Sequence, residues 1–182
     1  MAMSADGLNP TSIAQPSYRL TPEELCERYA VQICRFANLV ASRSGEADDV
    51  AQEALLKAMR ALPTYREDRG TLDAWLWRIV VNTAKDASRS RFRRLRLHVR
   101  LGTVPARAHP NAENIAVATG DLRSALAHLP QRDRTLIALR FGADMEIEQV
   151  SLCLDASPAA TRKALQRAVE RLKTELKGSD DA

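Results

Sequence analysis

The sequence predicts an all-α protein made of two small helical domains that are joined by a flexible linker. Apolar residues recur at three- and four-residue spacing through most of the chain, and the alternation typical of strands is almost absent. Aromatic residues make up only 4% of the 182 residues, too few for a typical strand-rich core. Between 98 and 119 the helical pattern is lost, and glycine, proline and asparagine appear without a sustained apolar face. This interval is the predicted linker.

The first domain is predicted at 21–97, after an N-terminal extension at 1–20 whose proline, serine and asparagine content favours disorder. Its helices are expected at about 21–42, 46–62 and 71–96, with a polar loop at 64–70. Thr21 has the hydroxyl that an N-cap needs, and Pro22 suits the first helical position. The second helix must stop before Pro63, because proline cannot continue it.

The second domain is predicted at 120–177, followed by a short tail at 178–182. Its helices are expected at about 121–129, 131–141, 145–154 and 158–176. Gly142 stands at the usual glycine position just past a helix, and Ser157 is a suitable N-cap for the last one. Only three residues, 155–157, separate the last two helices. So short a turn before a helix rich in arginine, lysine and glutamine is typical of a helix-turn-helix unit that binds DNA. A solvated helical hairpin has the same spacing.

Composition excludes several classes of protein. The chain has 27 lysine and arginine residues against 23 acidic ones, and no apolar run approaches the roughly 20 residues of a membrane-spanning helix. No basic segment followed by an apolar one marks a secretory signal at the N-terminus, so we expect a cytoplasmic protein without membrane insertion. Neither the three cysteines nor the three histidines have metal-site spacing, and we expect reduced packing thiols, no metal and no cofactor.

Charge is distributed unevenly along the chain. Between Lys85 and Arg100 there are seven basic residues and one acid, which suits a polyanionic partner. Between Glu46 and Glu53 there are four acids and no base. Two different partners are therefore expected, although a basic run can also be a solvated helix face.

Two groups of motifs stand out along the chain. The segments DDVAQEALLKA at 48–58, ALP at 61–63 and AWLWRIVVN at 74–82, with Asp86 downstream, resemble the second conserved region of bacterial extracytoplasmic-function sigma factors. The segments LAHLPQRDR at 126–134 and LRF at 139–141 resemble the fourth region of that family. The match extends from about Leu25 to Lys173 in the family's order, with a variable linker where the family has one.

The resemblance implies a subunit without catalytic activity that binds core RNA polymerase and directs it to promoters. In the family, the acidic and amide face of the second helix docks on the polymerase, which corresponds here to Asp49, Gln52 and Glu53. Such proteins are often held inactive by an anti-sigma factor, and this partner is implied as well.

The resemblance also implies two contacts with promoter DNA. The loop and helix after the docking face open the promoter −10 element, which implicates Tyr65, Arg66, Asn82, Lys85, Asp86, Arg89, Arg91 and Arg93. The last helix reads the duplex −35 element, which implicates Ala160, Arg162, Lys163, Gln166, Arg167 and Arg171. Asp155 departs from the family, which commonly has glycine in this turn; aspartate tolerates the left-handed conformation better than most residues.

Two other functions fit parts of the sequence. A conventional repressor or activator would also carry a helix-turn-helix, but it would bind its operator alone, whereas a sigma factor needs core polymerase. The basic third helix and the separate acidic helix favour the sigma factor. A nuclease or glycosylase is disfavoured because the sequence has no nucleophile motif and no convergent carboxylates.

Overall fold

The computed structural model describes residues 20–41, 44–101 and 120–180, and within these ranges every regular element is a helix. The all-α prediction is therefore confirmed. Most of the predicted N-terminal extension and the predicted linker lie outside the described residues. None of the helices described is both long enough and apolar enough to cross a membrane.

The N-terminal half forms a bundle of three helices, α1 (Pro22–Val40), α2 (Ser44–Ala61) and α3 (Leu72–Leu101). The predicted start of α1 is confirmed by a capping box: the Glu24 backbone N–H donates to the Thr21 hydroxyl, and the Thr21 N–H donates to the Glu24 carboxylate. Two 3₁₀ turns, η1 (Leu62–Thr64) and η2 (Glu67–Arg69), connect α2 to α3. Helix α3 continues through Leu101, so it enters the segment that the sequence assigns to the linker.

The C-terminal half contains α4 (Gly120–His128), α5 (Gln131–Ile137), the π-helical turn η3 (Ala138–Gly142), α6 (Ile147–Leu154) and α7 (Pro158–Asp180). Helix α6 begins two residues later than predicted, because Glu146 is its N-cap. Met145 lies before the helix and is buried in the core. Asp155 ends α6 in the left-handed region with φ 52°, as the sequence predicted for this position. The Ala160 N–H donates to the Ser157 hydroxyl, which caps α7.

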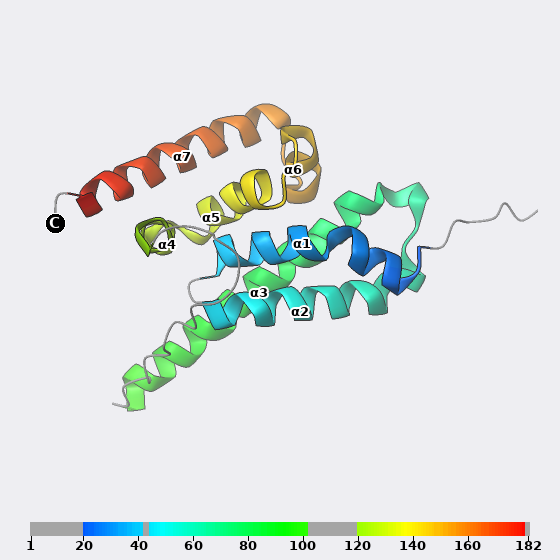
Figure 1. Ribbon diagram of the computed structural model, residues 1–182, viewed down its shortest axis with the longest axis horizontal. Coiled ribbons are helices and arrows are strands. Elements are labelled where there is room, and N and C mark those ends of the chain that lie inside the picture. The colour runs from blue at the N-terminus through cyan, green and yellow to red at the C-terminus, as the bar shows by residue number, and fades with distance from the viewer. Residues whose placement is uncertain (1–19, 42–43, 102–119, 181–182) are drawn as a thin grey trace, which may run out of the picture.

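The two halves share one hydrophobic core. Leu139, Met145 and Val150 of the C-terminal half are buried in the same cluster as the inward-facing residues of α1, α2 and α3. In Figure 1, α5 lies along α1, while α7 lies on the far side of α5. A second, smaller cluster holds α4, α5 and α7 together. Sequence patterning predicted two domains but gave no sign that they would pack against each other.

Gly142 marks the closest approach between the halves. A Cβ atom at this position would lie 2.9 Å from Leu39 Cδ1 and 3.2 Å from the backbone carbonyl of Arg35, both on α1. Real Cβ atoms essentially never approach other atoms as closely as the first distance. The sequence placed Gly142 just past a helix, but it is the last residue of η3 and has no positive φ. Its small size is needed for the contact with α1.

Candidate polymerase and nucleic-acid interfaces

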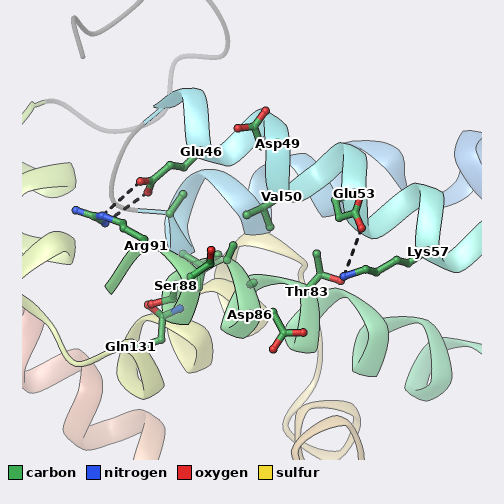
Figure 2. Close-up of a pocket in the computed structure, with 15 residues that line it drawn as sticks. Glu46, Asp49, Val50, Glu53, Lys57, Thr83, Asp86, Ser88, Arg91 and Gln131 are labelled. Carbon is green, nitrogen blue, oxygen red and sulfur yellow. Dashed lines mark hydrogen bonds and ion pairs between the residues drawn. The ribbon is translucent and has the colours of Figure 1, made fainter. Parts of the chain in front are cut away.

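The acidic face of α2 lies along a groove between α2 and α3. Asp49, Gln52 and Glu53 are all exposed, and Asp49 and Glu53 line the α2 side of this groove of about 440 Å³ (Figure 2). Glu53 pairs with Lys57 one turn later, at 3.5 Å between Nζ and Oε1. The structure therefore brings the three predicted docking residues to one solvent-facing surface, where carboxylates can attract a basic partner.

A continuous stripe on α3 carries five of the predicted −10 residues. At 3.6 residues per turn they fall within an arc of about 100° on the helix. All five are exposed: Asn82, Lys85, Asp86, Arg89 and Arg93. We call this set the α3 stripe. It combines three cations suited to phosphates with an amide and a carboxylate that can contact bases.

Arg91 does not belong to the α3 stripe. It lies on the other side of the helix, where its guanidinium meets Glu46 of α2 at 3.4 Å (Figure 2). The pair joins α3 to the first turn of α2. Helical spacing alone places Arg91 opposite the stripe, but it does not identify Glu46 as its partner, because the two residues are 45 positions apart.

The loop before α3 is organised by its own side chains. The ring of Tyr65 packs against Trp75 with centroids 5.3 Å apart, and its hydroxyl donates to the Gly70 carbonyl. Arg66 donates two hydrogen bonds to Asp68, at 3.1 and 2.9 Å. These bonds lower the pKa of the Asp68 carboxyl and raise that of the arginine. Both predicted −10 residues of the loop are thus held in place before any ligand arrives.

The outer face of α7 exposes all six predicted −35 residues. Arg162 faces Glu148 of α6 at 3.8 Å, and the Arg167 Nε–H donates to the Lys163 carbonyl. Arg171 is different, because it donates to Asp133 of α5, a carboxylate whose side chain is only 10% exposed. Arg171 therefore ties α7 to α5 in addition to facing solvent.

A cavity of about 540 Å³ separates α3 from the start of α7. Lys85 and Arg89 of the α3 stripe line it on one side, and Ala160 and Thr161 of α7 line it on another. Arg132 of α5 adds a third cation. In this arrangement the predicted −10 and −35 surfaces border the same space.

Phe92, one of two exposed phenylalanines in the described residues, was not identified as a candidate site residue from the sequence. Phe92 lies on α3 with 61% of its surface exposed, and the Arg96 guanidinium stands over its ring at 5.7 Å from the centroid. In the sequence, Phe92 is an aromatic residue inside a run of arginines. This combination is more typical of a surface that binds nucleic acid than of a helix face that only meets solvent. The charge of that run, taken alone, does not point to the ring.

The cysteines are free thiols, and no cluster of three or more metal-ligating side chains occurs in the part of the chain that the structure describes. The Cys26 thiol lies 3.7 Å from the Met59 sulfur. Cys153 of α6 is buried in the shared core, and burial raises its pKa to about 11.

Comparison with known proteins places both halves of the chain in one family. Residues 25–94 match the family model of sigma-70 region 2, and residues 119–172 match that of sigma-70 region 4. The sigma factor SigD of Mycobacterium tuberculosis is 31% identical over 157 residues, which cover 83% of this chain and 73% of SigD. The sigma factor SigV of Bacillus subtilis is 26% identical over 146 residues, covering 80% and 85%.

Two solved structures have the same fold. The sigma factor RpoE in complex with the anti-sigma factor NepR from Bartonella quintana has a TM-score of 0.66 at 22% identity, covering 85% of this chain and 96% of RpoE. CnrH in complex with the cytosolic domain of CnrY has a TM-score of 0.60 at 25% identity, covering 86% and 88%.

The two sigma-70 regions occur in the order that the sequence predicted, and the described helices carry both. Sigma factors direct RNA polymerase to promoters and are not themselves enzymes. The chain belongs to the extracytoplasmic-function family of RNA polymerase sigma factors.

Proposed function

We propose that three exposed faces divide the work of this sigma factor. The α2 face with Asp49, Gln52 and Glu53 docks on core RNA polymerase. The α3 stripe, with Tyr65 and Arg66 of the preceding loop, holds the −10 element, and the outer face of α7 reads the −35 element. The observation that carries the proposal is the separation of charge, with carboxylates exposed on α2 and cations on α3 and α7.

Physical chemistry supports each assignment. Exposed carboxylates steer a basic partner and fix its register. Cations on α3 neutralise backbone phosphates, while Asn82 and Asp86 offer polar groups to bases that leave the stack. On α7, arginine and glutamine can make bidentate contacts with guanine and adenine, respectively.

Reversing two charges on α2 tests the polymerase contact. We expect Asp49→Lys with Glu53→Lys to weaken binding to core polymerase at least tenfold, because cations would face a basic surface. Folding should be retained, since the exposed Glu53–Lys57 pair contributes about 0.5 kcal/mol or less. Fluorescence anisotropy of the labelled full chain, titrated with core polymerase, measures the affinity.

The matched control is Glu23→Lys with Glu27→Lys on α1. These two glutamates are also exposed and also four residues apart, so the change in charge and spacing is the same. Equal loss of affinity in both double variants would show that net charge, and not the α2 face, governs binding.

Two substitutions on α7 test the −35 contact. Arg162→Ala with Gln166→Ala should relax selectivity for the upstream element, by about 1 to 3 kcal/mol for each bidentate pair that the change removes. Arg171→Ala should instead lower the melting temperature, because it leaves the Asp133 carboxylate without this partner. Holoenzyme binding to promoter libraries reports selectivity, and thermal denaturation reports stability. If the double variant kept the wild-type preference for the −35 sequence, a different part of the protein would have to read that element.

An anti-sigma factor and a cytoplasmic location complete the proposal. The solved relative RpoE is in complex with an anti-sigma factor, and CnrH is in complex with a cytosolic domain. A protein that works on core polymerase must share its compartment. Co-purification from cells, followed by mass spectrometry, would identify a bound inhibitor. Removing that inhibitor should increase transcription by the holoenzyme.

A further inference from the structure

Phe92 occupies a distinctive place on α3. Counted at 100° per residue, it lies at the edge of the α3 stripe, 20° from the direction of Lys85 and 40° from that of Arg96. Ser88, Arg89, Phe92 and Arg93 border a shallow hollow of about 390 Å³. An exposed phenyl ring therefore meets two guanidinium groups and a hydroxyl at one spot.

This spot continues the surface that the proposed function assigns to the −10 element. Phe92 is ten residues beyond Asn82, which corresponds to about 15 Å along the helix axis, or four to five nucleotides at about 3.4 Å each. Helix α3 extends past α1 and α2 at this end (Figure 1). The Phe92 side chain is exposed. A strand following the stripe away from Asn82 would reach the ring.

The chemistry selects a nucleotide as the occupant. A nucleobase can stack on the ring regardless of its identity, and the neighbouring cations match the phosphates on either side of it. The Arg96 guanidinium lies over the ring at 5.7 Å from its centroid, so this face of the ring is accessible to a flat cationic or aromatic group. A purely apolar partner would offer no anion to the arginines around the ring, and Arg89 would keep only its exposed pair with Asp86 at 3.8 Å.

We propose that Phe92 is the base-stacking element of a nucleotide subsite on α3. This subsite rests on the proposed function of the α3 stripe. An unpaired promoter base stacks on the Phe92 ring, while Arg89 and Arg93 hold the adjoining phosphates. The subsite adds affinity for opened DNA without selecting a base.

The test uses holoenzyme assembled from core polymerase and the full chain. Its probe is a promoter fragment with an unpaired non-template strand, in which single abasic sites are placed one at a time near the −10 element. Phe92→Ala should weaken binding of the intact probe by about tenfold, the size expected for the removal of one base stack. Phe92→Trp should retain binding, because it keeps an aromatic face.

The abasic series distinguishes the loss of one base stack from a non-specific effect of the smaller side chain on binding. At one position, removing the base should weaken the wild-type complex about as much as Phe92→Ala does, and should have no further effect on that variant. Val31→Ala, at a similarly exposed apolar residue of α1, is the matched control and should leave binding unchanged. An alanine variant that binds like wild type, or whose defect is the same at every abasic position, overturns the subsite.

Further outcomes distinguish this proposal from the broader one. If Arg89→Ala and Arg93→Ala weaken promoter binding while Phe92→Ala does not, the subsite falls and the α3 stripe stands. If none of the three matters, both fall. If Phe92→Ala weakens binding to core polymerase without DNA, the ring contacts protein and the subsite is overturned.

Discussion

Replacing Phe36 by alanine is expected to lower the free energy of unfolding by about 3 to 5 kcal/mol. Phe36 is fully buried in the shared core, and its ring meets Trp77 edge to face with centroids 5.7 Å apart. Truncation removes the buried apolar area, the aromatic contact and the atoms that fill the space between α1 and α3. A change of this size is a large part of the stability of a small protein.

Urea denaturation followed by circular dichroism measures this effect. Phe92→Ala is the matched control, because it removes the same side chain from an exposed position and should change stability by about 0.5 kcal/mol or less. It also verifies that the variant used to test the nucleotide subsite is folded. Similar destabilisation in the two variants would contradict the packing described for Phe36.

Replacing Gly142 by leucine is expected to separate the C-terminal half from α1. The new side chain would meet the backbone of Arg35, which cannot rotate away as a side chain can. Overpacking of this kind costs about 1 to 3 kcal/mol, and moving the two halves apart relieves it. The expected result is a more open molecule in which both halves keep their helices.

The Cys153 thiol reports that opening. In the closed arrangement burial raises its pKa to about 11, so at about pH 8 the thiol is protonated and slow to react. Opening returns the pKa toward its lower ordinary value, which increases the thiolate fraction. Alkylation of Cys153 at about pH 8 should therefore accelerate at least roughly tenfold, as followed by peptide mass spectrometry.

Gly45→Leu supplies the comparison for this experiment. Gly45 lies in the first turn of α2, and no atom lies within 4 Å of the position where its Cβ would be. We expect this variant to leave Cys153 protected. If Gly142→Leu also left Cys153 protected, the close contact between η3 and α1 would not be what holds the two halves together.

Local structure could be predicted from the sequence wherever a residue acts on its own neighbours. Thr21 and Ser157 cap the helices that follow them, and Asp155 adopts the left-handed conformation. Each depends on atoms a few residues away, so its signal is present in a short stretch of sequence. The exposed faces of α2 and α7 follow from helical periodicity in the same way.

Contacts between distant segments could not be predicted in this manner. Periodicity identifies an apolar face on η3 and α6 but does not name its partner, and a face inside its own domain would give the same pattern. The pairs Arg91–Glu46 and Arg171–Asp133 depend on how helices cross, so both arginines resembled their exposed neighbours. Only the fold shows which arginines join two helices and which remain exposed for binding.

The cavity between α3 and α7 has a consequence for promoter length. Elements centred 10 and 35 base pairs upstream of a start site lie about 85 Å apart along DNA, at about 3.4 Å per base pair. Lys85 and Ala160, which the proposed function assigns to the −10 and −35 elements, border a single cavity of the closed molecule. Under that proposal, the two halves must separate before both elements can be bound at once, and the free energy of the separation is subtracted from the affinity for the promoter.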